Sequence, residues 1–280
     1  MVQDDKSRGS SSFFKVELNK GQFMSKKEHK SPELLDMMKA GVHFGHTTSR
    51  WHPKMEQNIF AVRQGIHIID LEKTAKHLHN ALDVVFDQVS QGKSILWIGT
   101  KKQARDLVRK YAEESNSPFV TDKWLGGTFT NFEIIQKLVD RLDKLEEQRD
   151  TGALNRYTKK EQLDFQKEID RLVYLVGGIR KMNNLPGAVF MIDLKENKTT
   201  RLEASKRGVP IIALTDTNIN PDGIAYPIPA NDDAVRSIEL FCKTMADTII
   251  EARAVFEKNK AEQKKVATTT KSIRENKKFK

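Results

Sequence analysis

Short apolar runs alternate along this chain with amphipathic helical patterns, and this alternation constrains the fold more than any other feature. The expected strands lie at residues 94–99, 119–120, 189–193, 211–214 and 226–229. Strands that are apolar throughout are typical of parallel sheets, because both faces of such sheets are covered. Helical patterns at residues 101–115 and 198–207 lie between strands. We therefore predict a parallel, three-layer α/β sheet.

The alternation stops between Trp124 and Pro186. Apolar residues here recur at steps of three and four, at Ile135, Leu138, Leu142 and Leu145 and again at Phe165, Ile169, Leu172, Val176 and Ile179. This spacing predicts two helices, each with one narrow apolar seam. Residues 151–154 separate the two patterns, so we expect an antiparallel coiled-coil hairpin inserted at residues 130–182. The hairpin could be a packing extension or a binding arm.

The two ends of the chain differ from its middle. Residues 1–30 are polar and rich in Ser and Lys, and residues 258–280 lose their apolar period. Because neither stretch can bury a core, we expect a flexible basic N-terminal arm and a disordered basic C-terminal tail around an α/β domain at residues 31–257. The remaining expected elements are a helix that opens at Ser31-Pro32 and ends at Gly41, a strand pair at 59–62 and 66–70, a helix at 72–91 and a last helix from Asn231 or Asp232 to about Glu257.

Charge and composition exclude several classes of protein. The net charge is +10, yet residues 1–30 contribute +3 and residues 257–280 contribute +6, so the body is nearly neutral. Basic residues cluster at 40–110, with eleven against six acidic ones, which favours a polyanionic partner. The single cysteine, Cys242, argues against a disulfide framework or a cysteine-rich zinc site. No apolar run approaches the roughly 18 residues of a membrane span, and we expect a cytoplasmic protein without a membrane partner.

Residues 40–55 concentrate the side chains that could carry chemistry. His43, His46 and His52 lie here with Arg50 and Trp51. Gly41 and Gly45 allow sharp turns and Pro53 prevents a continuous helix, so we expect a shaped loop rather than a helix or a strand. Such a loop could bind a metal ion, transfer protons or contact a nucleic acid.

Metal and acid–base chemistry have little support in these residues. Neither a His-Glu-x-x-His nor a Cys-x-x-Cys motif is present, which argues against a catalytic zinc site. Asp193 and Asp216 each follow an apolar strand, and with His46 they could hold a structural divalent cation. No nucleophile accompanies them, so we expect no catalytic residues and no required cofactor.

A nucleotide-binding enzyme is the alternative that we keep open. Ligands of open α/β sheets bind beyond the carboxyl ends of the strands, where Gly99-Thr100-Lys101-Lys102 lies. A helix N-terminus with two lysines could hold a phosphate there. However, neither Gly-x-Gly-x-x-Gly nor Gly-x-x-x-x-Gly-Lys-Ser/Thr occurs at this place.

An RNA-binding surface explains more of these residues than the other hypotheses do. Flat rings beside cations are the side chains that stack on bases and contact phosphates, and a second Gly-bent aromatic loop follows at residues 124–131. Either tryptophan could instead belong to the core. The candidate RNA-binding residues are Arg50, Trp51, Lys54, Arg63, Lys101, Lys102, Arg105, Trp124, Thr130 and Asn131.

Several longer motifs occur in a fixed order along residues 31–256. They are LLDMMKAGVHFGH at 34–46, IIDLEKT at 68–74, GTKK at 99–102, WLGG at 124–127, LPGAVFMID at 185–193, DTN at 216–218, PDG at 221–223 and IPANDDA at 228–234. In order and spacing, the chain resembles the family of the second protein of the bacterial-type small ribosomal subunit.

The resemblance implies a structural constituent of the small ribosomal subunit and not an enzyme. It implies a flavodoxin-like (Rossmann-like) sheet with a projecting coiled-coil hairpin. The partners would be small-subunit ribosomal RNA and neighbouring ribosomal proteins, among them the large OB-fold protein that captures messenger RNA in many bacteria. We expect no homo-oligomer, and an organellar ribosome stays open. By this resemblance His43, Gly45 and His46 shape the loop or contact a protein neighbour.

Overall fold

The computed structural model describes the backbone of residues 31–278 and the side chains as far as residue 261. The N-terminal arm predicted at residues 1–30 lies outside this range. A five-stranded parallel sheet forms the centre, and its strands are β4 (Ile95–Ile98), β5 (Phe119–Val120), β6 (Ala188–Met191), β7 (Ile211–Thr215) and β8 (Tyr226–Pro229). Their order across the sheet is β5-β4-β6-β7-β8. Counted along the chain, this is the flavodoxin-like order 2-1-3-4-5, which confirms the flavodoxin-like sheet that the family resemblance implies.

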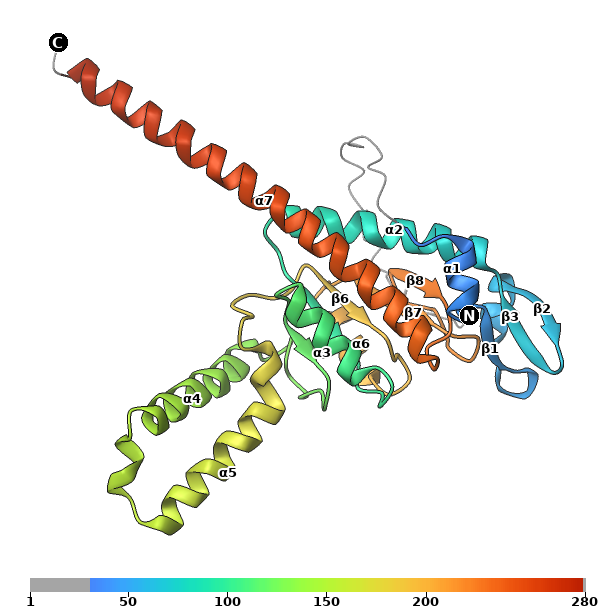
Figure 1. Ribbon diagram of the computed structural model, residues 1–280, viewed down its shortest axis with the longest axis horizontal. Coiled ribbons are helices and arrows are strands. Elements are labelled where there is room, and N and C mark those ends of the chain that lie inside the picture. Colours follow the sequence, from blue (N-terminus) through green and yellow to red (C-terminus); the bar gives the residue numbers. More distant parts are fainter. Residues whose placement is uncertain (1–30, 279–280) are drawn as a thin grey trace, which may run out of the picture.

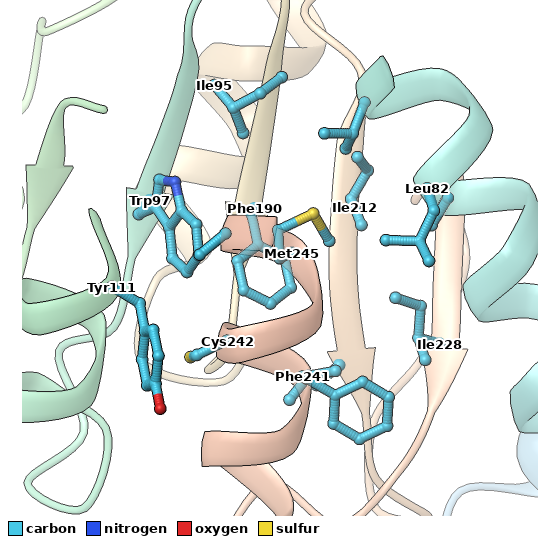
Figure 2. Packing of buried hydrophobic residues seen from close by; sticks show 14 of the residues in the cluster. Leu82, Ile95, Trp97, Tyr111, Phe190, Ile212, Ile228, Phe241, Cys242 and Met245 are labelled. Carbon is cyan, nitrogen blue, oxygen red and sulfur yellow. The ribbon is translucent and has the colours of Figure 1, made fainter. Parts of the chain in front are cut away.

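Both faces of the sheet are buried, which explains the unbroken apolar runs. Trp97 and Phe190 lie on neighbouring strands and point to one face, where their rings meet edge to face at 5.1 Å. Figure 2 shows this face packed against Leu82 of α2 (Leu71–Ser90) and against Cys242 and Met245 of α7 (Val235–Lys278). Helix α3 (Arg105–Glu114) completes the cover of this face.

The opposite face is covered by α6 (Lys198–Lys206) and by the base of an inserted helical hairpin. Leu96 and Val189, which alternate with the residues of the first face, pack here with Ala204 of α6. The sheet therefore lies between two helical layers, which confirms the predicted three-layer architecture.

The hairpin consists of α4 (Phe132–Asp150) and α5 (Lys159–Val176), which pack against each other and project from the body (Figure 1). Leu142 and Leu145 of α4 and Ile169 and Leu172 of α5 are buried, as the predicted seams require. A capping box at Thr158 and Glu161 begins the second helix, since each side chain bonds the other residue's backbone N–H. Two short 3-10 helices, η3 (Ala153–Arg156) and η4 (Gly177–Ile179), follow the two helices.

A small antiparallel sheet with the order β1-β3-β2 precedes the main sheet. Its strands are β1 (Phe44–Thr47), β2 (Ile59–Arg63) and β3 (Ile66–Ile69), and Gln64 and Gly65 form the tight turn expected between the last two, both with positive φ. The prediction of no strand within residues 40–55 is wrong, because β1 pairs with β3. Two 3-10 helices, η1 (Thr48–Arg50) and η2 (Pro53–Asn58), complete the segment.

Two helix boundaries differ from those predicted. Helix α1 (Leu34–Lys39) begins after Glu33 and not at Ser31-Pro32. Helix α7 continues to Lys278 instead of ending near Glu257, so the stretch predicted as a disordered tail is helical as far as Lys278. Residues 258–278 lack an apolar period, but seven of them are lysines, and lysine favours helix by itself. Figure 1 shows α7 extending beyond the body.

Across residues 31–278, the helices include none whose apolar stretch is long enough to cross a lipid bilayer.

Candidate functional site

The small sheet docks onto the edge of the main sheet where the parallel strands end. The backbone N–H of His46 donates to Thr217 Oγ1 at 2.9 Å, and that of His52 donates to the Thr217 carbonyl at 2.8 Å. Asn231, which follows β8, donates its backbone N–H to the Val42 carbonyl at 3.1 Å. Gly45 leaves no room for a side chain, since a Cβ there would lie 2.6 Å from Thr217 Cγ2.

An ionic network lies at this junction. His46 Nδ1 lies 3.0 Å from Asp216 Oδ2, and its Nε2 lies 3.4 Å from Asp233 Oδ2. Lys101 Nζ lies 2.5 Å from Asp233 Oδ1 and 3.1 Å from Asp232 Oδ1. One chain of contacts thus joins β1, the segment after β4, the end of β7 and the segment before α7. We call His46, Lys101, Asp216, Asp232 and Asp233 the edge network.

The pKa values in the edge network follow from burial and pairing. The hydrogen bond to Asp216 raises the pKa of His46 above 6.5, against the opposing effect of burial. Burial raises the pKa of Asp232 to about 6, although the nearby Lys101 ammonium opposes this change. Burial alone would lower the pKa of Lys101, but the carboxylates of Asp232 and Asp233 raise it overall, so the lysine stays protonated within the network.

The cation site considered from sequence is formed in part. Among the described residues, one ligand atom each from His46, Asp216 and Asp233 lie within 4.8 Å of one another. Asp233 thus takes the place expected for Asp193. The Asp193 carboxylate instead accepts the backbone N–H groups of Lys195 and Glu196, at 3.0 and 3.3 Å, so it shapes the turn before α6.

The place where a flavodoxin-like sheet would receive a nucleotide is occupied by the protein's own side chains. That place is the crevice between β4 and β6, where the strand order reverses. Asn197 Nδ2 donates here to Thr100 Oγ1 and to the Asp193 carbonyl, both at 2.9 Å. Both side chains are buried, and Lys101 is directed to the edge network rather than to a free phosphate site.

Arg50, Trp51 and Arg63 lie at one end of the small sheet. Arg63 and Thr47 both pair with Ile66 from opposite sides, and Thr48 donates its backbone N–H to the Gly65 carbonyl at 3.0 Å. Trp51 is 37% exposed. Its ring packs on the His67 ring at a centroid distance of 5.3 Å. The indole is therefore outside the core, but one side of it already contacts the protein.

The other predicted cations divide into paired and unpaired side chains. Lys54 forms an ion pair with Asp222. Arg105 donates from Nε to the Thr100 carbonyl at 2.8 Å and lies near Asp122. Within the described side chains Lys102, like Arg50 and Arg63, is exposed and makes no ion pair. These three cations are therefore the most available ones among those predicted.

The Trp124–Asn131 loop folds around a buried carboxylate. Glu203 of α6 accepts hydrogen bonds from the backbone N–H groups of Gly127, Phe129 and Thr130 at 2.7, 3.0 and 3.4 Å. The indole Nε1 of Trp124 donates to the same carboxylate at 3.3 Å. Trp124 is half-buried, whereas Thr130 and Asn131 are exposed at the start of α4.

Glu203 is charged in spite of its burial. Burial alone would raise the pKa of Glu203, but the hydrogen bonds from Gly127, Phe129, Trp124 and Thr130 outweigh it, so the pKa lies below 4.5. The carboxylate thus fixes the loop that leads into the hairpin.

His43 and His46 have different environments. His43 is half-buried and stacks in a tilted arrangement on Phe44, with ring centroids 4.1 Å apart. Burial lowers its pKa. His46 joins the edge network, and Gly45 fits against Thr217, so these three residues shape the docking of β1.

Sequence reasoning missed Asp233 and Glu203 as organising residues. Asp233 follows Asp232 just before the last helix, and its place beside His46 depends on how two sheets meet. Glu203 lies within an ordinary polar helix, and no local signal relates it to residues 124–131. Asp233 could have been found from its position in the motif IPANDDA at 228–234, on which the family resemblance rests. No sequence signal points to Glu203.

Comparisons with known proteins agree on one family. The model of the family described as ribosomal protein S2 matches residues 37–252. A protein named small ribosomal subunit protein uS2 from Nitratiruptor sp. is 47% identical over 224 residues, which is 80% of this chain and 84% of the relative. Proteins of the same name from Oleidesulfovibrio alaskensis and Dehalococcoides mccartyi are 47% and 46% identical and cover 81% and 79% of the chain, and 87% and 90% of their own lengths.

The family match extends from α1 into α7, and so includes the small sheet, the edge network and the hairpin. The matched residues contain all five strands of the parallel sheet. The chain belongs to the ribosomal protein S2 family.

Proposed function

We propose that this protein is a structural constituent of the small ribosomal subunit, where it binds small-subunit ribosomal RNA and neighbouring ribosomal proteins. The observation that carries the proposal is the family match over residues 37–252, together with relatives named small ribosomal subunit protein uS2. Its place of action would be the ribosome of the cytoplasm, as a single copy in each subunit.

The RNA contact would centre on the unpaired cations. Arg50 and Arg63 at the end of the small sheet, with the half-exposed Trp51, offer charge and a ring for stacking. Lys102 lies next to the edge network and adds a third cation. Thr130 and Asn131 would add polar contacts where the hairpin begins. Lys54, Lys101 and Arg105 would act differently, because their partners within the protein already neutralise them.

The edge network would position these residues and not perform chemistry. It joins the small sheet to the main sheet, and so fixes Arg50 and Arg63 relative to Lys102. The three carboxylates of the network outnumber its two basic side chains, so the network would repel RNA phosphates and leave them to the unpaired cations. A divalent cation held by His46, Asp216 and Asp233 would reinforce the same junction, with oxygen and imidazole ligands.

The helical hairpin would be a binding arm. Its seam buries only a narrow stripe, and its other faces carry many charged residues together with a few exposed apolar side chains. Several of these pair with each other, as in the two contacts between Arg141 and Glu168 at 3.1 and 3.2 Å. Ribosomal RNA and ribosomal proteins, including the large OB-fold protein that captures messenger RNA, are the partners that we propose for the arm and the body.

The enzymatic alternative has no supporting observation. At the crevice between β4 and β6, the buried Asn197 and Thr100 side chains hydrogen-bond to each other, and Lys101 is engaged by two aspartates. We therefore propose no reaction for this chain.

Binding of the purified chain to small-subunit ribosomal RNA at increasing salt tests the proposal. We expect the logarithm of the association constant to fall steeply with the logarithm of the salt concentration, because several phosphates are neutralised. Charge reversal at Arg50, Arg63 and Lys102 together should reduce this slope. Equal binding at low and high salt would contradict the proposed RNA contact.

A further inference from the structure

A cleft lies between the hairpin and the edge of the main sheet, away from the edge network. Its volume is about 550 Å³, and it is bounded by α3, β5, α4, α5 and η4. This volume lies within the range of about 300–1,000 Å³ that is usual for ligand pockets. The cleft can therefore accept a few side chains of a partner, but not a folded domain.

Close backbone packing fixes the shape of this cleft. Gly178 of η4 lies against β5, where a Cβ would come within 2.2 Å of the Phe119 carbonyl oxygen. Arg180 lies 3.0 Å from Asp143 and 2.7 Å from Glu146 of α4. These contacts hold the base of the hairpin against the sheet edge, so the cleft exists before any partner binds.

The cleft is acidic although the whole chain is basic. Four carboxylates line it, from Glu113, Asp122, Glu146 and Asp170, against the two guanidinium groups of Arg109 and Arg180. Arg109 pairs with Asp122 at 3.6 Å, and Arg180 pairs with Glu146. Glu113 and Asp170 form no ion pair within 4.0 Å with the described side chains, although Asp170 accepts a hydrogen bond from Gln166 and interacts electrostatically with the Arg149 guanidinium.

Apolar side chains lie beside these two carboxylates. Val173 and Tyr174 of α5 line the cleft and are 46% and 52% exposed. A tyrosine ring next to unpaired carboxylates suits an arginine or lysine, which can stack on the ring while its charge is neutralised.

We propose that this cleft binds a basic peptide segment of a neighbouring protein of the small subunit. The inference rests on the proposed function for the identity of that neighbour. RNA is the wrong occupant, because phosphates would face unpaired carboxylates and no unpaired cation of the cleft. A segment rich in arginine and lysine gains from the charges of Glu113 and Asp170, while Tyr174 and Val173 contact its aliphatic stems.

A photo-crosslinking experiment in assembled subunits tests the inference. Tyr174 is replaced by p-benzoylphenylalanine in the full-length chain, cells are irradiated, and small subunits are isolated on a sucrose gradient. Mass spectrometry then identifies the crosslinked partner. We expect a segment of another small-subunit protein in which basic residues outnumber acidic ones. A crosslink to ribosomal RNA, to residues 1–30 of the same chain, or to nothing would overturn the inference.

Charge-reversed variants make the test specific to the cleft. The double substitution Glu113→Lys and Asp170→Lys, added to the crosslinker chain, should lower the crosslink yield by about tenfold, which corresponds to 1.4 kcal/mol. Glu147→Lys is the control, because Glu147 is exposed on α4 and does not line the cleft. An equal yield from the double variant and the control would also overturn the inference.

The same gradient separates the two possible failures. If the chain is absent from small subunits, the proposed function fails, and the inference fails with it. If the chain is present but its crosslink goes elsewhere, only the inference fails.

Discussion

Glu203 shows how one buried charge can organise a distant loop. Its carboxylate is 7% exposed and accepts hydrogen bonds from three backbone N–H groups and an indole of residues 124–131. A hydrogen bond to an ionised group contributes about 1.5–3 kcal/mol, which is more than a hydrogen bond to a neutral group does. The conformation of the loop therefore depends on the ionised form of Glu203.

We predict that Glu203→Gln lowers the free energy of unfolding by about 1–3 kcal/mol at pH 7. The pKa of Glu203 is lowered on folding, so its stabilising contribution is present above pH 4.5 and is lost as the pH falls through the lowered pKa. The variant should therefore show a weaker loss of stability in acid than the parent chain. Urea unfolding at a series of pH values measures this, and identical pH profiles would refute the role of Glu203.

Substitution of Lys101 and of its neighbour Lys102 should affect different properties, thermal stability in one case and RNA binding in the other. Lys102→Ala should leave the Tm nearly unchanged and reduce the salt slope of RNA binding by about 1, because this cation is exposed and unpaired. Lys101→Ala should leave that slope unchanged but lower the Tm by several degrees, because the buried Asp232 loses its ion-pair partner and Asp233 keeps only His46. Thermal melts and RNA binding at several salt concentrations distinguish the pair. If Lys102→Ala lowered the Tm and Lys101→Ala reduced the salt slope, the division into paired and unpaired cations would be contradicted.

Among the elements, β1 depends on a glycine. At Gly45 a Cβ would lie 2.6 Å from Thr217 Cγ2 and 3.1 Å from the His67 carbonyl oxygen, and Thr217 is fully buried. Neither neighbour can move away freely, so the docking of the small sheet requires glycine at this position.

We predict that Gly45→Ala costs about 1–3 kcal/mol of stability, as overpacking in a filled interior does. The control is Gly126→Ala, since Gly126 has open space around its Cα and no positive φ. Chemical denaturation of the two variants gives the comparison. If both variants unfold at the same denaturant concentration as the parent chain, close packing at Gly45 does not stabilise the junction of the two sheets, and the prediction is wrong.

The hairpin has a stabilising seam of its own. Leu142 is fully buried between α4 and α5, whereas Ile134 on α4 is 57% exposed. We predict that Leu142→Ala costs about 2–5 kcal/mol and that Ile134→Ala costs much less. Hydrogen exchange should show the loss of protection mainly in α4 and α5, with β6 nearly unchanged. Equal loss of protection in β6 would contradict a separate seam.

The elements that sequence patterns predict well are those whose burial is simple. The strands β4, β6 and β7 are buried on both faces, so they appear as unbroken apolar runs, and the hairpin seams follow one stripe of each helix. Strand β1 was missed because Gly45, His46 and Thr47 satisfy no strand pattern, and its pairing depends on β3. The end of α7 was missed because helix propensity, and not an apolar period, carries it past Glu257.

The candidate site was predictable only in outline. The sequence places Lys101, Asp193 and Asp216 at strand ends, but strand ends do not specify which side chains meet. The contacts of His46 with Asp216 and Asp233 arise because two sheets dock, and Asp193 is used in a local turn instead. Which cations are already paired is likewise a property of tertiary packing, as Lys54 and Asp222 illustrate.

In the whole molecule, the unpaired cations and the unpaired carboxylates of the cleft lie on different parts of the surface. The unpaired cations Arg50 and Arg63 lie at one end of the small sheet and Lys102 follows Lys101 of the edge network, while the acidic cleft lies at the base of the hairpin. Such a division fits a component that contacts RNA on one surface and a basic protein segment on another. The hairpin and α7 both extend beyond the body (Figure 1) and enlarge the surface available for assembly.

Sedimentation through a sucrose gradient tests whether this chain is a constituent of the small ribosomal subunit. A tagged copy of the full-length chain is expressed at low level in cells, and its distribution between the top of the gradient and the small subunits is measured. We predict that the chain migrates with small subunits, in about one copy per subunit. It would be contradicted if the chain stays at the top of the gradient as free protein while the small subunits are intact.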